Sequence, residues 1–483
     1  MKKLTYTIVA AFLFCSVEAQ IQNAGFENMT DGLPNHWNVK KTDSYEGKID
    51  YTHYFGGKAS MQLTGKTDQS KEFQSFSQKV PLDIQQLQKI EISAYVKSEN
   101  TNGKINLWTQ VKDENGEMID FGNSESQQRP IAVNKDWTKY SLTFTVDKNV
   151  KSLLLGGVLS GNGTVWFDHF ELNKIPFSNE EPSKKAAKYI QDFKNIVKKN
   201  SIFSDKLDWQ NIETNLHNLS KGMKTIDDTT PALSYIIQNL RQAGDNHSFI
   251  SGKERSEKQK SGNIYETKPD SRLIDQNIGY ISVPAFGSLN KEVGNDFALQ
   301  IHNMIKKLDS ENTIKGWIVD LRSNTGGNME PMIGGLGSLI GEGTLGYFVY
   351  KDQKTPWIYK NRQFGATKIT EPYDLKSGNS KIAVLIGPRT ASSGEATTIA
   401  FIGKSNVKLF GQPSAGYTSA NSIYPLSDGK IFAVASSYEM DRNGKVYSGK
   451  IDPDITVESK EGQDMDIETA KHWILSEQQT YPQ

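Results

Sequence analysis

The chain has 483 residues, more than one typical hydrophobic core accommodates, so two or three domains are expected. Lysine plus arginine and aspartate plus glutamate both number 56, and the formal net charge is zero. That balance gives no electrostatic case for nucleic acid or an anionic membrane surface as a partner.

The first residues, MKKLTYTIVAAFLFCSVEAQ, have the pattern of a secretory signal peptide. Two lysines precede an apolar run, and small residues precede an expected cut between Ala19 and Gln20. The run is too short to span a bilayer, and no later stretch is long and apolar enough to do so. With residues 1–19 removed, the protein is expected to be exported: periplasmic, cell-surface or secreted. The one cysteine, Cys15, lies in that segment, so no disulfide is expected in the mature chain.

Residues 20–175 alternate apolar and polar side chains. The stretch KIEISAYVKS places Ile90, Ile92, Ala94 and Val96 on one face, and KINLWTQVKD, WTKYSLTFTVD and GTVWFDHFEL continue the pattern between polar turns. Several short strands at this spacing predict an all-β jelly-roll sandwich.

Helical periodicity replaces the alternation at residues 176–260. Ala186, Ile190, Phe193 and Val197 share one face of a predicted helix, and two more amphipathic segments follow. A small helical segment is therefore expected between the sandwich and the rest of the chain.

From residue 261 to 483, strand and helix signals alternate. Strands are predicted at GYISVPAF, GWIVDLRSN, KIAVLIGP and VKLFG, with helices at NKEVGNDFALQIHNMIKKL and from about Gly394. Alternation of this kind predicts an α/β core with a central sheet and helical cover. The whole chain is thus expected to be multidomain: sandwich, helical segment and α/β core.

The stretch GPRTASSGEATTIAFIG contains two serines where a strand gives way to a helix. A helix start at the carboxyl end of a strand offers backbone N–H groups to a developing oxyanion, so Ser392 or Ser393 is a candidate nucleophile. The alternative is an N-cap serine with Glu395 in a capping role. Upstream, VDLRSNTGGN places Gly326 and Gly327 in a turn whose backbone is free to approach a ligand closely.

The motifs DLRSNTGGN, TASSGEA, FGQPSAGYTSAN and GKIDPDITV, in this order, resemble the tail-specific, or C-terminal-processing, serine peptidases and their tricorn-protease relatives. The resemblance covers roughly residues 185–456. It implies that Ser392 is the nucleophile and that no cofactor is required for catalysis. It also implies an oxyanion hole built from the N–H of Ser393 and that of Gly326 or Gly327.

The general base differs between the two branches of this family. The processing branch uses a lysine, but Tyr417 stands where that lysine is expected, and Lys404 lies in a different loop. The tricorn branch uses a histidine from the end of the helical segment, and GDNHSF places His247 there.

A carboxylate is expected to orient the imidazole of His247. Asp452 and Glu439 are the candidates, with Asp441 and Asp454 behind them. The alternative is that Ser448 replaces the carboxylate, in which case the orienting group is weakened or comes from elsewhere. Only about 30 polar residues separate Ile250 from IGYISV, too few for an inserted peptide-binding PDZ domain.

The opening NAGFENMTDGLPNHW and the closing GTVWFDHFEL resemble the ends of carbohydrate-binding-module-like jelly rolls. The resemblance implies glycan binding by this part and a structural calcium ion with Glu27 and Asp168 as candidate ligands. Ordinary surface acids are the alternative interpretation of these two residues.

Three functional hypotheses follow. The first is an exported serine endopeptidase that hydrolyses peptides or unfolded proteins through an acyl-enzyme. The second is a catalytically impaired homologue that binds peptides or glycans, which the missing lysine and the unassigned carboxylate favour. The third is a carbohydrate-active enzyme, suggested by four tryptophans of the sandwich, although no paired-carboxylate pattern supports it.

Overall fold

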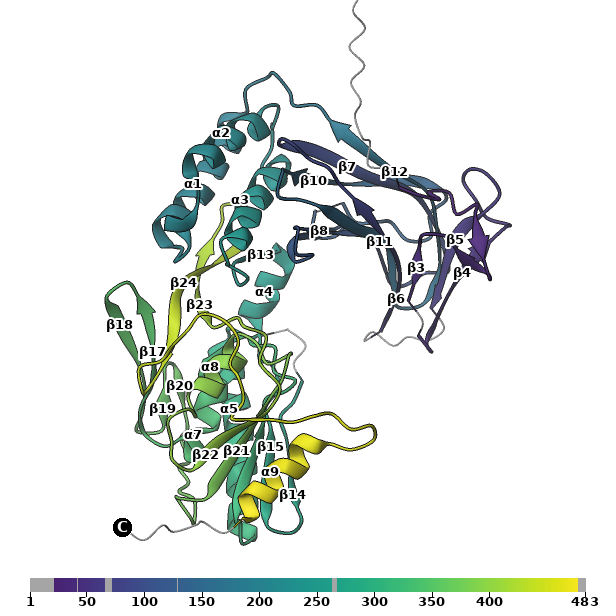
Figure 1. Ribbon diagram of the computed structural model, residues 1–483. Helices are drawn as coiled ribbons and strands as arrows, with labels where there is room; N and C mark the ends of the chain where they lie inside the picture. The colour runs from purple at the N-terminus through teal and green to yellow at the C-terminus, as the bar shows by residue number, and fades with distance from the viewer. Residues whose placement is uncertain (1–20, 41, 66–71, 128, 263–266, 477–483) are drawn as a thin grey trace, which may run out of the picture. The chain divides into compact units, whose positions relative to one another are not determined.

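The computed structural model describes residues 21–40, 42–65, 72–127, 129–262 and 267–476 (Figure 1). The expected signal peptide at residues 1–19, with Cys15, lies outside these ranges. The chain divides into two compact units. The first runs to residue 191 and includes 208–242, and the second comprises 192–207 and 243–483.

The first unit is built on an antiparallel β-sandwich, as the alternating pattern predicts. One sheet has the order β10 (Thr138–Val146), β7 (Gln88–Glu99), β12 (Gly163–Ile175), β5 (Ser60–Gly65), β4 (Tyr45–Asp50). The other has the order β3 (Asn38–Val39), β6 (Phe73–Pro81), β11 (Ser152–Ser160), β8 (Lys104–Lys112), β9 (Met118–Asn123). A short hairpin joins β1 (Met29–Thr30) and β2 (Leu33–Pro34).

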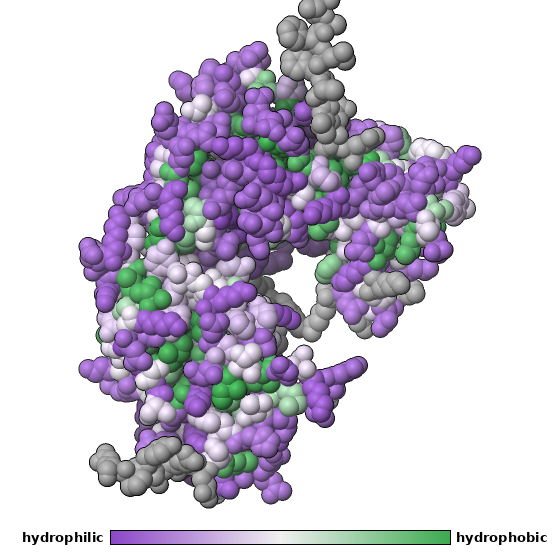
Figure 2. Space-filling view, viewed as in Figure 1, coloured by the Kyte–Doolittle hydropathy of each residue, from purple (hydrophilic) through white to green (hydrophobic). Residues whose placement is uncertain are grey.

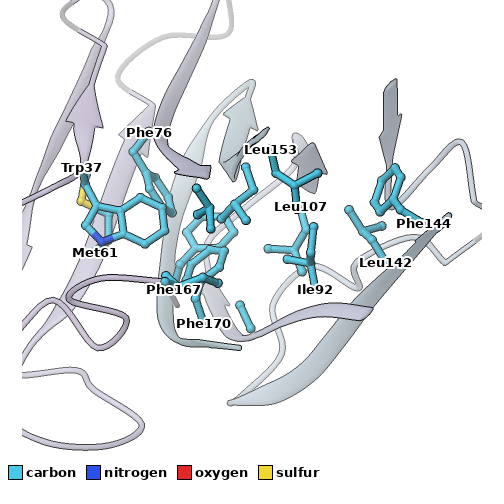
Figure 3. Packing of buried hydrophobic residues seen from close by; sticks show 14 of the residues in the cluster. Trp37, Met61, Phe76, Ile92, Leu107, Leu142, Phe144, Leu153, Phe167 and Phe170 are labelled. Atoms are coloured by element: carbon cyan, nitrogen blue, oxygen red, sulfur yellow. The ribbon is translucent and has the colours of Figure 1, made fainter. Parts of the chain in front are cut away.

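The core of the sandwich lies between its two sheets (Figure 3). The aromatic end is a set of tilted and edge-to-face rings, in which the Phe26 ring lies 5.1 Å from Trp37 and 5.6 Å from Phe76. Ile92 of one sheet and Leu107 of the other belong to the same core and lie farther from the aromatic end. Successive residues of a strand face opposite ways, so the alternating residues Ile90, Ile92, Ala94 and Val96 of β7 all face this core and are buried.

Two predicted helices pack with the sandwich instead of with the α/β core. α2 (Trp209–Ser220) and α3 (Thr230–Gln242) belong to the first unit, whereas the boundary at residue 191 falls within α1 (Lys184–Asn200). The Gln238 side chain of α3 donates to Asp120 Oδ2 and to the Thr145 carbonyl of the sandwich. The sequence-based division at residues 176 and 261 therefore differs from the observed one, because buried polar contacts attach α3 to the sandwich.

The second unit contains the expected α/β sheet. Its order is β14 (Asp270–Ile274), β15 (Ile278–Ser282), β16 (Gly316–Asp320), β21 (Lys381–Ile386), β22 (Val407–Gly411), β26 (Ile455–Thr456). All neighbours run parallel except the antiparallel pair β14–β15. One face packs against α5 (Lys291–Glu311), α6 (Met329–Gly335), α7 (Gly337–Ile340) and α8 (Ser393–Ile399). The opposite face packs against α9 (Met465–Leu475).

A second, antiparallel sheet completes this unit. Its order is β13 (Phe249–Ser251), β24 (Ile431–Asp441), β17 (Gly343–Tyr350), β18 (Gln353–Lys360), β19 (Gln363–Phe364), β20 (Thr367–Lys368). β23 (Ser419–Pro425) and β25 (Val446–Tyr447) also pair with β24. Helix α4 (Lys253–Ser261) follows β13.

The visible surface is mostly hydrophilic, with hydrophobic residues in separate patches (Figure 2). Within the described ranges, none of the helices combines the length and the apolar character that crossing a membrane requires.

Candidate active site

Ser392 occupies a strained turn between β21 and α8. Its backbone has φ 52° and ψ −121°, a conformation that costs a non-glycine residue free energy and that is frequent at functional sites. The side chain is half-buried, and the helix begins at the next residue. A serine on a sharp strand-to-helix turn is presented in the way a nucleophile requires.

Glu395 holds this turn in place. Its Oε2 accepts the N–H of Ser392 at 2.8 Å, so the capping role considered for the sequence is realised together with the strained geometry. The same oxygen accepts the N–H of Tyr417, and Oε1 accepts the Ser414 hydroxyl and the Gly416 N–H. Burial raises the pKa of Glu395, and these four hydrogen bonds oppose that shift. The carboxylate therefore ties the Ser392 turn to the loop before β23.

The paired glycines lie directly against Ser392. A Cβ placed on Gly326 would come within 2.8 Å of both the Ser392 Cβ and the Ala391 carbonyl oxygen. Gly326 and Gly327 have φ 97° and 122°, in the region that favours glycine. The Ser393 hydroxyl donates to the Gly327 carbonyl at 2.7 Å, which fixes the two segments relative to each other.

Two backbone N–H groups beside Ser392 have no hydrogen-bond acceptor among the described residues. Among the described residues, no acceptor is bonded to the N–H of Gly327 or to that of Ser393. The N–H of Gly326 is occupied, because it donates to Asn324 Oδ1 at 2.9 Å. Of the two glycines named from the sequence, Gly327 is therefore the one whose N–H is available to an oxyanion, with Ser393 as the second donor.

Asn324 supports both segments, although its role was not predicted. It is fully buried, and its carbonyl accepts the Ala391 N–H at 2.9 Å. Its side-chain amide donates to the Val283 carbonyl at 3.1 Å. The position of Asn324 in DLRSNTGGN was visible, but its contacts cross from one strand end to the next and leave no local pattern.

His247 is held beside the loop that Glu395 anchors. The Nδ1 atom lies 3.1 Å from the Ser419 hydroxyl, and the ring stacks on Tyr417 with centroids 5.6 Å apart. The backbone N–H of His247 donates to Asp245 Oδ1 at 3.0 Å, and the backbone carbonyl of His247 accepts a hydrogen bond from the Asn421 side chain at 3.0 Å. Burial lowers the pKa of His247, whereas a hydrogen bond to the backbone of Ser419 and the charge of Asp245 raise it.

The carboxylates expected to orient His247 do not contact its ring. Asp452 is exposed, and no hydrogen bond from its carboxylate to His247 is found in the described part of the chain. Glu439 is buried beside Glu395, and its Oε2 has no hydrogen-bond partner among the described residues. Burial first, and the charge of Glu395 second, raise the pKa of Glu439 well above its ordinary value. A hydroxyl, that of Ser419, stands where a carboxylate was expected.

The Lys404 ammonium is engaged at the end of a helix. Lys404 donates from Nζ to the carbonyls of Leu339 and Ile340 at 2.8 and 2.7 Å, where it binds the end of α7. Burial, with the nearby charge of Arg442, lowers its pKa to about 8. The lysine position of the processing branch is occupied by Tyr417, whose ring packs on His247.

In the first unit, Glu27 and Asp168 approach the same point. An ideal Cβ on Gly25 would lie 3.6 Å from Asp168 Oδ1 and 3.8 Å from Glu27 Oε1. Asp168 is fully buried and accepts N–H groups from Phe55, Gly56 and His169. Within the described ranges, no group of three or more His, Cys, Asp or Glu side chains is arranged to hold a metal ion.

An aromatic cluster lies beside that point, on the sheet that contains β7 and β12. The rings of Phe55 and Tyr95 stack with centroids 3.5 Å apart and planes 11° apart. Trp137 and His169 flank Phe55, each at 6.2 Å, and Phe55 is 43% exposed. Of the other tryptophans in the sandwich, Trp37 and Trp166 are buried.

Comparisons with known proteins place this site in a peptidase family. Residues 277–457 match Peptidase family S41. The chain is 31% identical over 327 residues to the nisin-resistance protein of Lactococcus lactis subsp. lactis, covering 65% of this chain and 92% of that protein. The chain belongs to peptidase family S41. The resemblance inferred from the motifs is thereby confirmed.

Other S41 relatives cover less of the chain. The carboxy-terminal processing protease CtpA of Bacillus subtilis (strain 168) is 25% identical over 191 residues, which are 39% of this chain and 36% of that protein. The solved structure of a lipoprotein from Streptococcus agalactiae is 28% identical, covers 60% of this chain and 96% of that one, and has a TM-score of 0.50. Residues 18–156 match a carbohydrate binding domain, so the expected order of a carbohydrate-binding sandwich before an α/β S41 core is also confirmed.

Proposed function

We propose that this S41 protein is an exported serine endopeptidase, with Ser392 as nucleophile and His247 as general base. The observation that carries the proposal is the bridge made by Glu395. One oxygen of Glu395 holds the backbone of both Ser392 and Tyr417, and Tyr417 stacks on His247. Two hydrogen bonds and one ring contact thus connect the nucleophile to the base. The signal-peptide pattern of residues 1–19 supports export.

The steps follow from the groups present. His247 Nε2 takes the proton of Ser392 Oγ as that oxygen attacks the carbonyl carbon of the peptide bond. The N–H groups of Gly327 and Ser393 receive the oxyanion. His247 then gives its proton to the leaving amine as the C–N bond breaks, and an acyl-enzyme ester remains on Ser392. A water molecule, deprotonated by His247, releases the acyl group and restores the serine.

The substrate is proposed to be a peptide or an unfolded protein segment. The scissile carbonyl must come within hydrogen-bond distance of both N–H groups. One relative is named for resistance to nisin, so nisin is one peptide to offer as a substrate.

The test is hydrolysis of a quenched peptide and of nisin by wild type, Ser392→Ala and Ser393→Ala. Ser392→Ala is expected to abolish turnover. Ser393→Ala should retain much of it, because its contribution is a backbone N–H. Wild-type turnover in Ser392→Ala would overturn the assignment, and an inactive wild type would favour the alternative of a catalytically impaired, peptide- or glycan-binding homologue.

A second function, glycan binding by the first unit, is favoured by the aromatic cluster. Stacked rings with an exposed Phe55 offer an apolar face to a sugar ring. Retardation of the full chain in polysaccharide gels should weaken with Phe55→Ala and stay unchanged with Phe121→Ala, an exposed ring on β9. Equal retardation of both variants and wild type would count against this site.

A structural calcium ion is proposed at Glu27 and Asp168. Carboxylate oxygens suit this hard cation, and the buried Asp168 has only backbone N–H partners to balance its charge. Burial raises the pKa of Asp168, whereas its backbone hydrogen bonds and the charge of His169 oppose that shift. Since calcium takes roughly 6–8 oxygens, backbone carbonyls would have to supply the rest.

A further inference from the structure

The imidazole of His247 needs a partner on Nδ1 that fixes its tautomer and its orientation. Serine catalysis by a histidine requires Nε2 to be unprotonated and to face the serine, and a group that accepts from Nδ1–H secures both. In a Ser-His-Asp triad that group is a carboxylate. In this chain the atom bonded to Nδ1 is the Ser419 hydroxyl oxygen, at 3.1 Å.

Among the described residues, no carboxylate is hydrogen-bonded to the His247 ring. Asp245 accepts the N–H groups of His247 and Ser248 on Oδ1 and the Ser248 hydroxyl on Oδ2, so it holds the backbone and not the ring. Glu395 is saturated by four donors. Glu439 is buried next to Glu395, where burial first and like charge second raise the pKa of its carboxyl well above the ordinary value. Asp452 is exposed.

Ser419 is well placed for a positioning role. It is the first residue of β23 and pairs with Tyr438 of β24, so its backbone is fixed by the sheet. Its side chain is buried, which strengthens a hydrogen bond by excluding water. On the same strand, the Asn421 side chain donates to the His247 carbonyl at 3.0 Å, so β23 contacts His247 at both its ring and its backbone.

We propose that Ser419 is the positioning residue of His247, holding Nδ1 in place of the triad carboxylate. This inference rests on the proposed peptidase function. Nδ1–H donates to Ser419, Nε2 keeps its lone pair for the Ser392 proton, and the stacked ring of Tyr417 sets the plane of the imidazole. A neutral acceptor leaves the imidazolium less stabilised than a carboxylate would.

The inference predicts a specific kinetic signature. Ser419→Ala removes the hydroxyl, so kcat should fall about tenfold or more while KM stays within about twofold, because a base that is less well oriented slows the chemical step. The acid limb of the kcat/KM profile should also move to lower pH, because an acceptor that favours protonated His247 is lost. Ser419→Thr, which keeps the hydroxyl, should restore both.

Ser422→Ala is the matched control. Ser422 lies on the same strand, and its hydroxyl bonds Ser436 at 2.7 Å and not His247. This variant should keep the kcat and the pH profile of wild type. A purely structural role for β23 hydroxyls would instead give similar losses in the Ser419 and Ser422 variants with no shift of the acid limb, which would overturn the proposal.

A measurement without substrate separates this inference from the proposed function. Histidine titration by NMR, with the His247 signal assigned from its absence in His247→Gln, should give a lower pKa in Ser419→Ala than in wild type. An unchanged pKa would refute the contact with the Ser419 hydroxyl even if the protein is an active peptidase. A lowered pKa in a protein that hydrolyses no peptide would refute the peptidase assignment and leave the contact intact.

Discussion

Glu395 shows at the residue scale how one side chain connects two distant segments. It is fully buried, and each of its oxygens accepts two hydrogen bonds. One of the four comes from Ser392, and the other three come from residues 414–417. Glu439, in the same buried region, has an oxygen with no partner among the described residues and a pKa raised well above the ordinary value. The two glutamates therefore differ: Glu395 accepts four hydrogen bonds, whereas Glu439 is a buried carboxyl with a raised pKa.

Replacing each glutamate by glutamine should separate these roles. Glu395→Gln puts an NH2 group against backbone N–H donors, so the free energy of unfolding should fall by about 1–3 kcal/mol and peptide turnover should drop strongly. Glu439→Gln mimics the protonated carboxyl and should leave turnover close to wild type. Thermal melts and turnover on one peptide check both. Loss of turnover in Glu439→Gln, with full turnover in Glu395→Gln, would reverse the assignment.

The pH dependence of turnover follows from His247. Burial, the largest influence, lowers its pKa below the ordinary value of about 6.5, so the neutral base persists to lower pH. The acid limb of kcat/KM should therefore lie below about pH 6.5, with activity lost as the pH falls through the His247 pKa. His247→Ala should lower turnover by several orders of magnitude, whereas Lys404→Met should lower it little. Full turnover in His247→Ala would contradict this base.

At the scale of elements, the site depends on the close approach of two turns. The glycine turn after β16 and the Ser392 turn after β21 lie at the carboxyl ends of neighbouring parallel strands. Gly326 permits their contact, because any side chain there would meet the Ser392 Cβ and the Ala391 carbonyl.

Gly326→Ala should distort this contact. The positive φ of 97° and the 2.8 Å approach predict a loss of about 1–3 kcal/mol in unfolding free energy, together with loss of turnover. Gly444→Ala is the matched control, because Gly444 has φ 92° with nothing within 4 Å of its Cβ position. It should lose stability and keep turnover. Wild-type turnover in Gly326→Ala would show that the glycine turn does not shape the site.

Helices and strands could be predicted where the apolar periodicity is strong, whereas contacts between distant residues could not be predicted. The strands at residues 88–99, 316–320 and 381–386 follow from their apolar patterns, and Ser392 follows from its motif. Asp245 was missed. Ser419 was also missed, because its contact with His247 joins residues 172 positions apart. The carboxylates Asp452 and Glu439 were expected to orient His247 because triads use one, and no sequence pattern revealed that a hydroxyl fills that position.

At the scale of the whole molecule, each unit is proposed to carry a site of its own. The first has the carboxylate pair of Glu27 and Asp168 beside an aromatic cluster, and the second has the serine site. Ligands of one unit are therefore expected to stabilise that unit, and inhibitors of Ser392 to act on the other.

Calcium should stabilise the full-length protein if the first unit binds it. Binding to the folded state alone contributes about 2.7 kcal/mol at a free concentration one hundred times Kd, so the melting transition of that unit should rise by several degrees over its value in chelator. Glu27→Gln should remove the difference, and Glu114→Gln, at an exposed position, should preserve it. Identical melts in calcium and in chelator would contradict the site.

The most direct test of the central claim is covalent labelling of the full-length protein with a fluorophosphonate, followed by peptide mapping. The account predicts one modified residue, Ser392, with labelling abolished in Ser392→Ala, greatly slowed in His247→Ala and retained in Ser393→Ala. Absence of labelling in the folded wild type, or a label at a residue other than Ser392, would contradict it.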